Sequence, residues 1–335
     1  MTWPANAGTA SRPGLQKAIA YAQGQNAERL IVWRANSVLV DQTFGTAAAD
    51  AEVNSYHMHW NVLVLLMGCA VADGHIGSID DPAASYITEW SADARSAITL
   101  KHLLTMSAGL KFYLDSSDPR DLASQLFYGP ERADAVVRWP IESAPGRVFE
   151  YNYIVPEVLG LILERATGKP YAAYLAERLW RPIGNRDAGV WLDGPNGRAY
   201  QNAALFAHAT DWLNLGILVA RRGNWNGVQL VPEAWIKAMT TASPTNPNFG
   251  FVWLGSPHNE RRHFSSRIGY YSYASEPYTA EDVVIFDGYV HRVYIIPSRD
   301  IVVAYIGQSG RVGQERRARW DDALIPNAVL DGFST

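Results

Sequence analysis

The stretch Asn54-Ser-Tyr-His-Met-His-Trp-Asn-Val-Leu-Val-Leu-Leu-Met-Gly-Cys-Ala-Val-Ala-Asp-Gly74 decides the fold of this chain. Its second half is an apolar run from Val62 to Val71, followed by Asp73-Gly74. An apolar run of this length with a glycine at its end predicts a buried helix. The first turn carries polar and aromatic side chains, and a helix N-terminus presents unpaired N–H groups and a partial positive charge. We therefore expect the rest of the chain to cover this helix and to frame a ligand site at its first turn.

The composition of the whole chain excludes several classes of protein. The 335 residues are 48% hydrophobic and 19% charged, enough for a sizeable core in two fused lobes. A net charge of −4 argues against nucleic acid as a partner. The longest apolar run, of about eleven residues, is too short to span a bilayer. The start of the chain lacks the basic and apolar regions of a secretory signal. We expect a cytoplasmic protein that binds a small molecule.

The single cysteine and the histidines give no sign of a cofactor. Cys69 lies inside the apolar run, where a small buried side chain is expected rather than a redox group. The sequence has no paired-cysteine metal site, no glycine fingerprint for a dinucleotide and no phosphate-binding loop. No cofactor and no metal are therefore expected.

Local signals predict a helix and a hairpin first, further helices in the middle of the chain and strands at the end. A hairpin is expected over residues 29–41, with Ala35-Asn36 at the turn. Thr99 is a candidate N-cap, and Thr167-Gly168 is a candidate helix end. Further helices are expected over 14–25, within 115–138, and over 155–166, 171–179, 207–222 and 232–239. Short β-branched and aromatic runs predict strands at 249–253, 265–273, 282–286, 291–296 and 300–307.

These elements predict an α+β protein. The hairpin and the C-terminal strands are expected to share one antiparallel sheet, with the central helix packed on it. The sheet lobe would comprise residues 1–75 and 230–335, and a helical lobe would comprise residues 76–229. The pocket would lie between the two lobes.

Several segments together resemble the serine β-lactamase and penicillin-binding-protein superfamily. The resemblance is greatest to the branch with class C β-lactamases, esterases and aminohexanoate-oligomer hydrolases. The motifs that carry it are Gly74-His-Ile-Gly-Ser-Ile-Asp-Asp-Pro82, Ile98-Thr-Leu-Lys-His-Leu-Leu-Thr-Met-Ser-Ala-Gly109, Pro145-Gly-Arg-Val-Phe-Glu-Tyr151, Gly160-Leu-Ile-Leu-Glu-Arg-Ala-Thr-Gly168, Ala207-His-Ala-Thr-Asp-Trp-Leu-Asn-Leu-Gly216, Gly223-Asn-Trp-Asn-Gly227 and Pro232-Glu-Ala-Trp235. The resemblance implies a β-lactamase-like fold.

The resemblance also implies an acyl-enzyme mechanism, from which this sequence departs. In the family, a serine at the start of the central helix attacks an ester or amide, aided by a lysine one turn later and by a tyrosine. Counted back from Gly68, the serine position falls on His57 and the lysine position on Trp60. The tyrosine position falls on Tyr151. With neither hydroxyl nor amine in place, we expect the ordinary serine acylation to be lost.

The histidines of the first turn have alternative roles. His57 at a helix N-terminus would stay neutral and act as a base or hydrogen-bond donor, or it would fill a disused pocket. His59 faces away from His57 on a helix, which argues against a zinc pair and leaves His59 as pocket lining. Trp60 would fill the space of the missing lysine or form an aromatic wall. Ser55 is a nearby hydroxyl that does not face His57 on a helix, and it is kept as a binding residue.

The remaining candidates come from two other segments. Tyr151 would transfer a proton or donate a hydrogen bond. Asn152 and Tyr153 would line the pocket or serve the structure. Tyr289 and His291, on a strand loosely matching the family's third motif, would border the pocket or lie on an exposed strand face.

Three hypotheses remain open at this stage. The first is a repurposed biosynthetic enzyme that performs acid–base hydrolysis, a lyase reaction or a cyclisation with His57 and Tyr151. The second is a catalytically silent ligand-binding protein. The third is residual serine esterase or amidase activity through Ser55.

Overall fold

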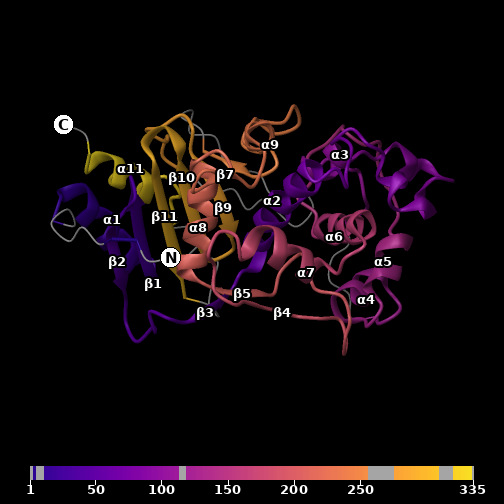
Figure 1. Cartoon of the computed structure of the whole chain (residues 1–335), viewed down its shortest axis with the longest axis horizontal. Coiled ribbons are helices and arrows are strands. Elements are labelled where there is room, and N and C mark those ends of the chain that lie inside the picture. The colour runs from indigo at the N-terminus through magenta and orange to yellow at the C-terminus, as the bar shows by residue number, and fades with distance from the viewer. Residues whose placement is uncertain (1–2, 5–10, 113–117, 256–274, 309–319, 334–335) are drawn as a thin grey trace.

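A computed structural model describes residues 3–4, 11–112, 118–255, 275–308 and 320–333. Within these residues, a six-stranded antiparallel sheet lies at one end of the molecule and a group of helices at the other (Figure 1). Helix α2 (His59–Ala72) lies between them. This arrangement confirms the predicted α+β fold, with an antiparallel sheet flanked by helices. None of the described helices is long and apolar enough to cross a membrane.

The sheet joins the two ends of the chain. Its strands are, in spatial order, β2 (Ser37–Thr43), β1 (Ala27–Arg34), β11 (Ile301–Gly307), β10 (His291–Ile296), β9 (Val284–Gly288) and β8 (Trp253–Leu254). All neighbouring strands pair antiparallel, which confirms that the N-terminal hairpin and the C-terminal strands share one sheet. Every residue of β9, β10 and β11 is buried. Both faces of the sheet are therefore covered.

The predicted hairpin is confirmed at its turn. Ala35 and Asn36 both adopt positive φ, 46° and 67°. A two-residue turn with positive φ at both positions matches the right-handed twist of the flanking strands. Asparagine tolerates this backbone conformation well, so the local sequence favours the turn.

Helix α8 (Ala209–Ala220) packs on β10 and β11. A Cβ at Gly216 would lie 2.6 Å from Val302 Cγ1 and 2.9 Å from Val293 Cγ1, so only glycine allows this close approach. The prediction placed residues 209–220 in the helical lobe. The structure places them on the sheet, because nearly all residues of α8 are buried and the sheet supplies the apolar surface that covers them. Two other helices, α1 (Pro13–Gly24) and α11 (Leu324–Asp331), pack on each other.

The remaining helices are mostly short. They are α3 (Leu100–Leu104), α4 (Leu122–Tyr128), α5 (Arg132–Arg138), α6 (Ile154–Thr167), α7 (Tyr171–Leu175) and α9 (Glu233–Met239). A π-helical turn (Ala176–Trp180) follows α7, and 3-10 turns occur at Tyr56–Met58 (η2), Ala83–Ser85, Thr88–Trp90, Ala94–Ala97 and Pro297–Arg299. Thr99 caps α3 by accepting a hydrogen bond from His102 N, and Gly168 ends α6 at φ 69°, as predicted.

Two small sheets complete the fold. One has the order β3 (Glu52–Asn54), β5 (Leu205–His208), β4 (Gly189–Val190), and the other pairs β6 (Asn224–Trp225) with β7 (Val228–Gln229). Strand β3 leads directly into η2 and α2. The first small sheet therefore fixes the chain just before the central helix.

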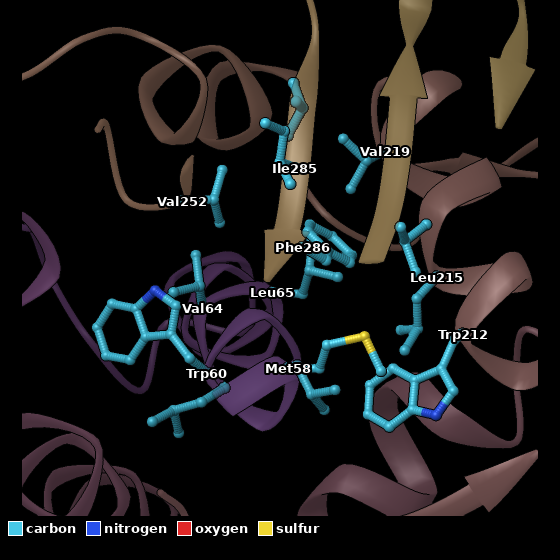
Figure 2. Packing of buried hydrophobic residues seen from close by; sticks show 14 of the residues in the cluster. Met58, Trp60, Val64, Leu65, Trp212, Leu215, Val219, Val252, Ile285 and Phe286 are labelled. Atoms are coloured by element: carbon cyan, nitrogen blue, oxygen red, sulfur yellow. The ribbon is translucent and has the colours of Figure 1, made fainter. Parts of the chain in front are cut away.

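Apolar contacts hold α2 against the sheet. Figure 2 shows Val64 and Leu65 of α2 beside Ile285 and Phe286 of β9, with side chains of α8 completing the cluster. Twelve of the fourteen residues of α2 are buried, so the predicted buried helix is confirmed.

One predicted strand, at residues 249–253, is not formed over its full length. The run Phe249–Trp253 is largely a turn rather than a strand, because Gly250 N donates to Val252 O and Phe251 N donates to Met239 O. The contact of Phe251 with Met239 at the end of α9 is non-local, so the β-branched and aromatic composition could not reveal it. The predicted strand at 265–273 lies outside the described residues.

Candidate functional site

The turn that precedes α2 is built around a strained tyrosine. Tyr56 adopts φ 44°, a left-handed conformation that costs a non-glycine residue about 1–3 kcal/mol. Asn54 Oδ1 accepts hydrogen bonds from Tyr56 N at 3.0 Å and from Ala204 N at 3.2 Å, which fixes the turn. Such strain persists only where the surrounding structure determines the conformation, and it is typical of functional sites.

The Ser55 hydroxyl forms hydrogen bonds with the backbone at this turn. The residue is 0% exposed, its Oγ accepts a hydrogen bond from Leu205 N at 3.2 Å and it donates one to Tyr56 O at 3.1 Å. The buried hydroxyl therefore has a structural role in the turn, through one hydrogen bond to β5 and one to the neighbouring Tyr56. A role of Ser55 as a binding residue stays a prediction.

His57 and Tyr151 lie together, as expected. His57 is exposed, and its ring centroid lies 5.9 Å from that of Tyr151 at an interplanar angle of 41°. Tyr151 is half-buried and stacks on Trp253 with a centroid distance of 5.8 Å and an angle of 26°. The fold thus brings together an imidazole from the start of α2 and a phenol from the segment before α6.

Burial raises the pKa of the Tyr151 phenol well above its usual range, and the negative charge of Asp287 raises this pKa further. Burial favours the neutral form of a phenol because the phenolate loses its hydration. Tyr151 is therefore protonated near neutral pH. It can donate a hydrogen bond but cannot take up a proton there.

His59 and Trp60 lie in the core instead of lining a pocket. Trp60 is 1% exposed, and its Nε1 donates to Phe251 O at 2.7 Å. In Figure 2 its ring lies beside Val64 and near Val252. The His59 ring is buried between Ala203 O, 3.0 Å from Nδ1, and the Tyr171 hydroxyl, 2.8 Å from Nε2. Both side chains point inward, because α2 begins at residue 59, and their expected roles in ligand binding stay predictions.

The buried His59 predicts a loss of stability in acid. Burial lowers the pKa of His59 from 6.5 to about 4, although the bond to Ala203 opposes this shift. The unfolded chain therefore binds a proton that the folded chain does not. Stability present above pH 6.5 falls as the pH drops towards 4, by about 3 kcal/mol for this histidine.

This loss is measured by urea unfolding of the wild type and of His59→Gln from about pH 7 down to about pH 4. The difference between their two pH dependences isolates His59, since both proteins share all other titrating groups. The variant should lose about 3 kcal/mol less over this range. Parallel pH dependences would contradict the prediction. His75→Gln is the control, because it removes an exposed histidine and leaves His59 in place.

Asn152 and Tyr153 make structural contacts within the helical region. Asn152 is buried, its Nδ2 donates to Leu110 O at 3.0 Å, and its Oδ1 accepts a hydrogen bond from Ile154 N. Tyr153 is half-buried and packs against the rings of Phe112 and Phe127. These contacts support the structural alternative for Asn152 and Tyr153.

The turn between β9 and β10 reaches the start of α2. A Cβ at Gly288 would lie 2.5 Å from Met58 Cγ and 2.8 Å from Ser55 O, so this approach requires glycine. Tyr289, at φ 64°, lies with its ring 5.5 Å from that of Tyr56. The structure therefore brings Tyr289 to the rim of the site.

Buried charged side chains stabilise the turn between β9 and β10. Asp287 Oδ1 accepts from Tyr289 N at 3.1 Å and lies 2.9 Å from Arg292 Nη1. Arg292 Nε also lies 2.9 Å from Asp322 Oδ1. His291, the first residue of β10, is fully buried, so the alternative of an exposed strand face is wrong for it.

Comparison with known proteins identifies the family. A family model described as Beta-lactamase matches residues 62–326, most of the chain. This chain belongs to the β-lactamase family. The match confirms the family resemblance and the β-lactamase-like fold. It begins just after the segment His57–Trp60.

The proteins similar to this chain include hydrolases. Esterase EstB from Burkholderia gladioli is 31% identical over 137 residues, 36% of this chain and 33% of that protein. The 6-aminohexanoate-dimer hydrolase of Paenarthrobacter ureafaciens is 21% identical over 223 residues, 63% of this chain and 56% of that protein. The structure of EstCE1, a hydrolase with promiscuous acyltransferase activity, aligns with a TM-score of 0.70 at 16% identity, covering 94% of this chain and 98% of that one. The chain spans 33% to 52% of the length of the first curated relatives it matches.

Three residues of this β-lactamase-family site were not among the predicted site residues: Tyr56, Trp253 and Asp287. Trp253 stacks on Tyr151, and Asp287 raises the pKa of the Tyr151 phenol. Tyr56, the residue before His57, has the strained left-handed backbone conformation. In the sequence, Tyr56 lies within the stretch Asn54–Gly74, Trp253 ends the predicted strand at 249–253, and Asp287 stands two residues before Tyr289. Nothing else in the sequence marks them as site residues. Among the described residues, no group of three or more histidine, cysteine, aspartate or glutamate side chains could hold a metal ion.

Proposed function

We propose that this β-lactamase-family protein hydrolyses a small ester or amide by acid–base chemistry of His57 and Tyr151, without a covalent serine intermediate. The observation that carries the proposal is the pair of rings, 5.9 Å apart, formed by an exposed imidazole and a half-buried phenol. The Ser55 hydroxyl, by contrast, is buried and bonded to the backbone on both sides. No lysine occurs between Lys17 and Lys101, so α2 carries no ammonium group to activate a serine.

In the proposed reaction, His57 takes a proton from a water molecule as the water oxygen attacks the carbonyl carbon. The phenol of Tyr151 donates a hydrogen bond to the oxygen that becomes negative. The tetrahedral intermediate then collapses, and the imidazolium of His57 returns the proton to the leaving group. One water is consumed, and an acid and an alcohol or amine are released. A lyase or a cyclisation reaction would use the same base and donor.

One observation favours a second candidate function, a ligand-binding protein without turnover. The start of α2 offers neither an accessible serine nor a lysine, because the Ser55 hydroxyl is buried and bonded to the backbone and no lysine occurs between Lys17 and Lys101. This candidate predicts binding of a small molecule that survives His57→Ala and Tyr151→Phe, with no product formed.

Pre-steady-state kinetics and a serine-reactive probe test the proposal. With p-nitrophenyl acetate, we expect linear release of p-nitrophenolate without a burst, because no acyl-enzyme accumulates. A fluorophosphonate probe should label no serine of the folded protein. A burst together with a labelled serine would overturn the proposal. Loss of that label in Ser55→Ala would support the residual esterase hypothesis instead.

A further inference from the structure

His291 makes two hydrogen bonds that determine its protonation. Gly307 N donates to Nδ1 at 3.2 Å, and Nε2 lies 3.1 Å from Asn54 O. A backbone N–H can only donate and a carbonyl oxygen can only accept. Nδ1 is therefore the acceptor, and Nε2 carries the proton. The neutral imidazole with its proton on Nε2 satisfies both partners at once.

These bonds join the large sheet to the turn that carries His57. Gly307 is the last residue of β11, and Asn54 is the last residue of β3. The carbonyl oxygen of Asn54 accepts a hydrogen bond from His291 Nε2, and the side-chain Oδ1 of Asn54 accepts one from Tyr56 N. His291 and Asn54 thus form a continuous chain of hydrogen bonds that ends one residue before His57.

Ring packing reinforces this connection. The Tyr56 ring lies 5.8 Å from the His291 ring and 5.5 Å from the Tyr289 ring. Tyr56 has the strained φ of 44°, so its position depends on the groups that hold it. His291 joins this turn to the large sheet through the hydrogen bonds at its two ring nitrogens.

We propose that His291 is a positioning residue, which fixes the turn Asn54–Tyr56 through its Nε2–H and so directs the His57 ring toward Tyr151. This role rests on the proposed function, in which His57 and Tyr151 act together. It predicts that loss of the hydrogen-bond donor at the Nε2 position changes the orientation of the His57 ring. Loss of the acceptor at the Nδ1 position should leave that orientation unchanged.

Two variants of His291 separate these positions. In His291→Gln, the amide nitrogen can occupy the Nε2 position and donate to Asn54 O. In His291→Asn, the shorter amide can accept from Gly307 N but cannot reach Asn54. Both variants place a polar amide in the same buried site, so they form a matched pair for stability.

The readout is the nuclear Overhauser effect between the His57 and Tyr151 ring protons, recorded on protein with labelled histidine. We expect this cross-peak in the wild type and in His291→Gln, and its loss in His291→Asn at a similar melting temperature. A merely structural role would lower the melting temperature of both variants and leave the cross-peak in place.

Several results would overturn the proposal. These are absence of the cross-peak from the wild type, its persistence in His291→Asn, or its loss from a folded His291→Gln. Loss of the cross-peak from a folded His291→Gln overturns the proposal even if His291→Asn does not fold. The measurement needs no turnover, so it separates this role from the proposed function, which would fail if His57→Ala kept full activity.

Discussion

His57→Ala is expected to lower kcat/KM for the hydrolysis of p-nitrophenyl acetate by about 10²–10⁴-fold, the usual contribution of a positioned general base. His57 is exposed on the protein surface beside Tyr151, so its removal should not disturb the core. Surface substitutions of this kind usually change stability by less than about 0.5 kcal/mol. The rate is measured at saturating and subsaturating substrate, and circular dichroism verifies the fold.

Two further variants make this result specific. Tyr151→Phe removes the proposed oxyanion donor and should lower kcat by about 10²-fold, with the packing on Trp253 retained. His75→Ala removes another exposed histidine, just beyond α2, and should leave the rate unchanged. An unchanged rate in His57→Ala would exclude the acid–base proposal. If the wild type itself forms no product, the ligand-binding function is favoured.

Arg132→Met is expected to lower the free energy of unfolding by about 4 kcal/mol, as for other buried ion pairs that lose one partner. Arg132 of α5 and Glu157 of α6 are almost fully buried, and Arg132 Nη2 lies 2.7 Å from Glu157 Oε1. The Arg132 guanidinium also lies over the Tyr200 ring, at 3.4 Å from its centroid. The methionine would leave the Glu157 carboxylate buried without its counter-ion. Urea unfolding measures the change.

The double variant Arg132→Met, Glu157→Gln is the control for this prediction. Glu157 Oε1 also accepts hydrogen bonds from Gln201 N and Asn202 N, and a glutamine oxygen can replace it there. Because no charge is then buried alone, the double variant should be more stable than Arg132→Met. A loss of less than about 1 kcal/mol in the single variant would show that the pair behaves as an exposed one.

The elements predicted correctly have local causes. The Ala35-Asn36 turn, the Thr99 cap and the Gly168 helix end each depend on the conformation or hydrogen bonding of one or two residues. The apolar run of α2 likewise predicts burial by its composition alone. The C-terminal helix α11 was not predicted. Its apolar residues Leu324, Ile325, Ala328 and Val329 follow a helical spacing, but Pro326 interrupts the pattern.

The site was predicted only in part. The meeting of His57 with Tyr151 followed from the family resemblance, and the structure places them together. Ser55 and His59 are expected in a pocket because they lie beside His57 in the sequence, and Trp60 because it stands at the family's lysine position. Their directions depend on a 3-10 turn before α2 and on the left-handed backbone of Tyr56, neither of which has a sequence signal. The same holds for Trp253, which reaches Tyr151 from a segment a hundred residues away.

The sequence by itself determined the buried helix and the shared sheet of hairpin and C-terminal strands. Each of these depends on composition and on spacing along the chain. The tertiary structure alone decided which of the side chains near the start of α2 face the solvent. That choice depends on long-range hydrogen bonds from Leu205, Ala204 and His291 to the turn, which form only when distant strands are brought together.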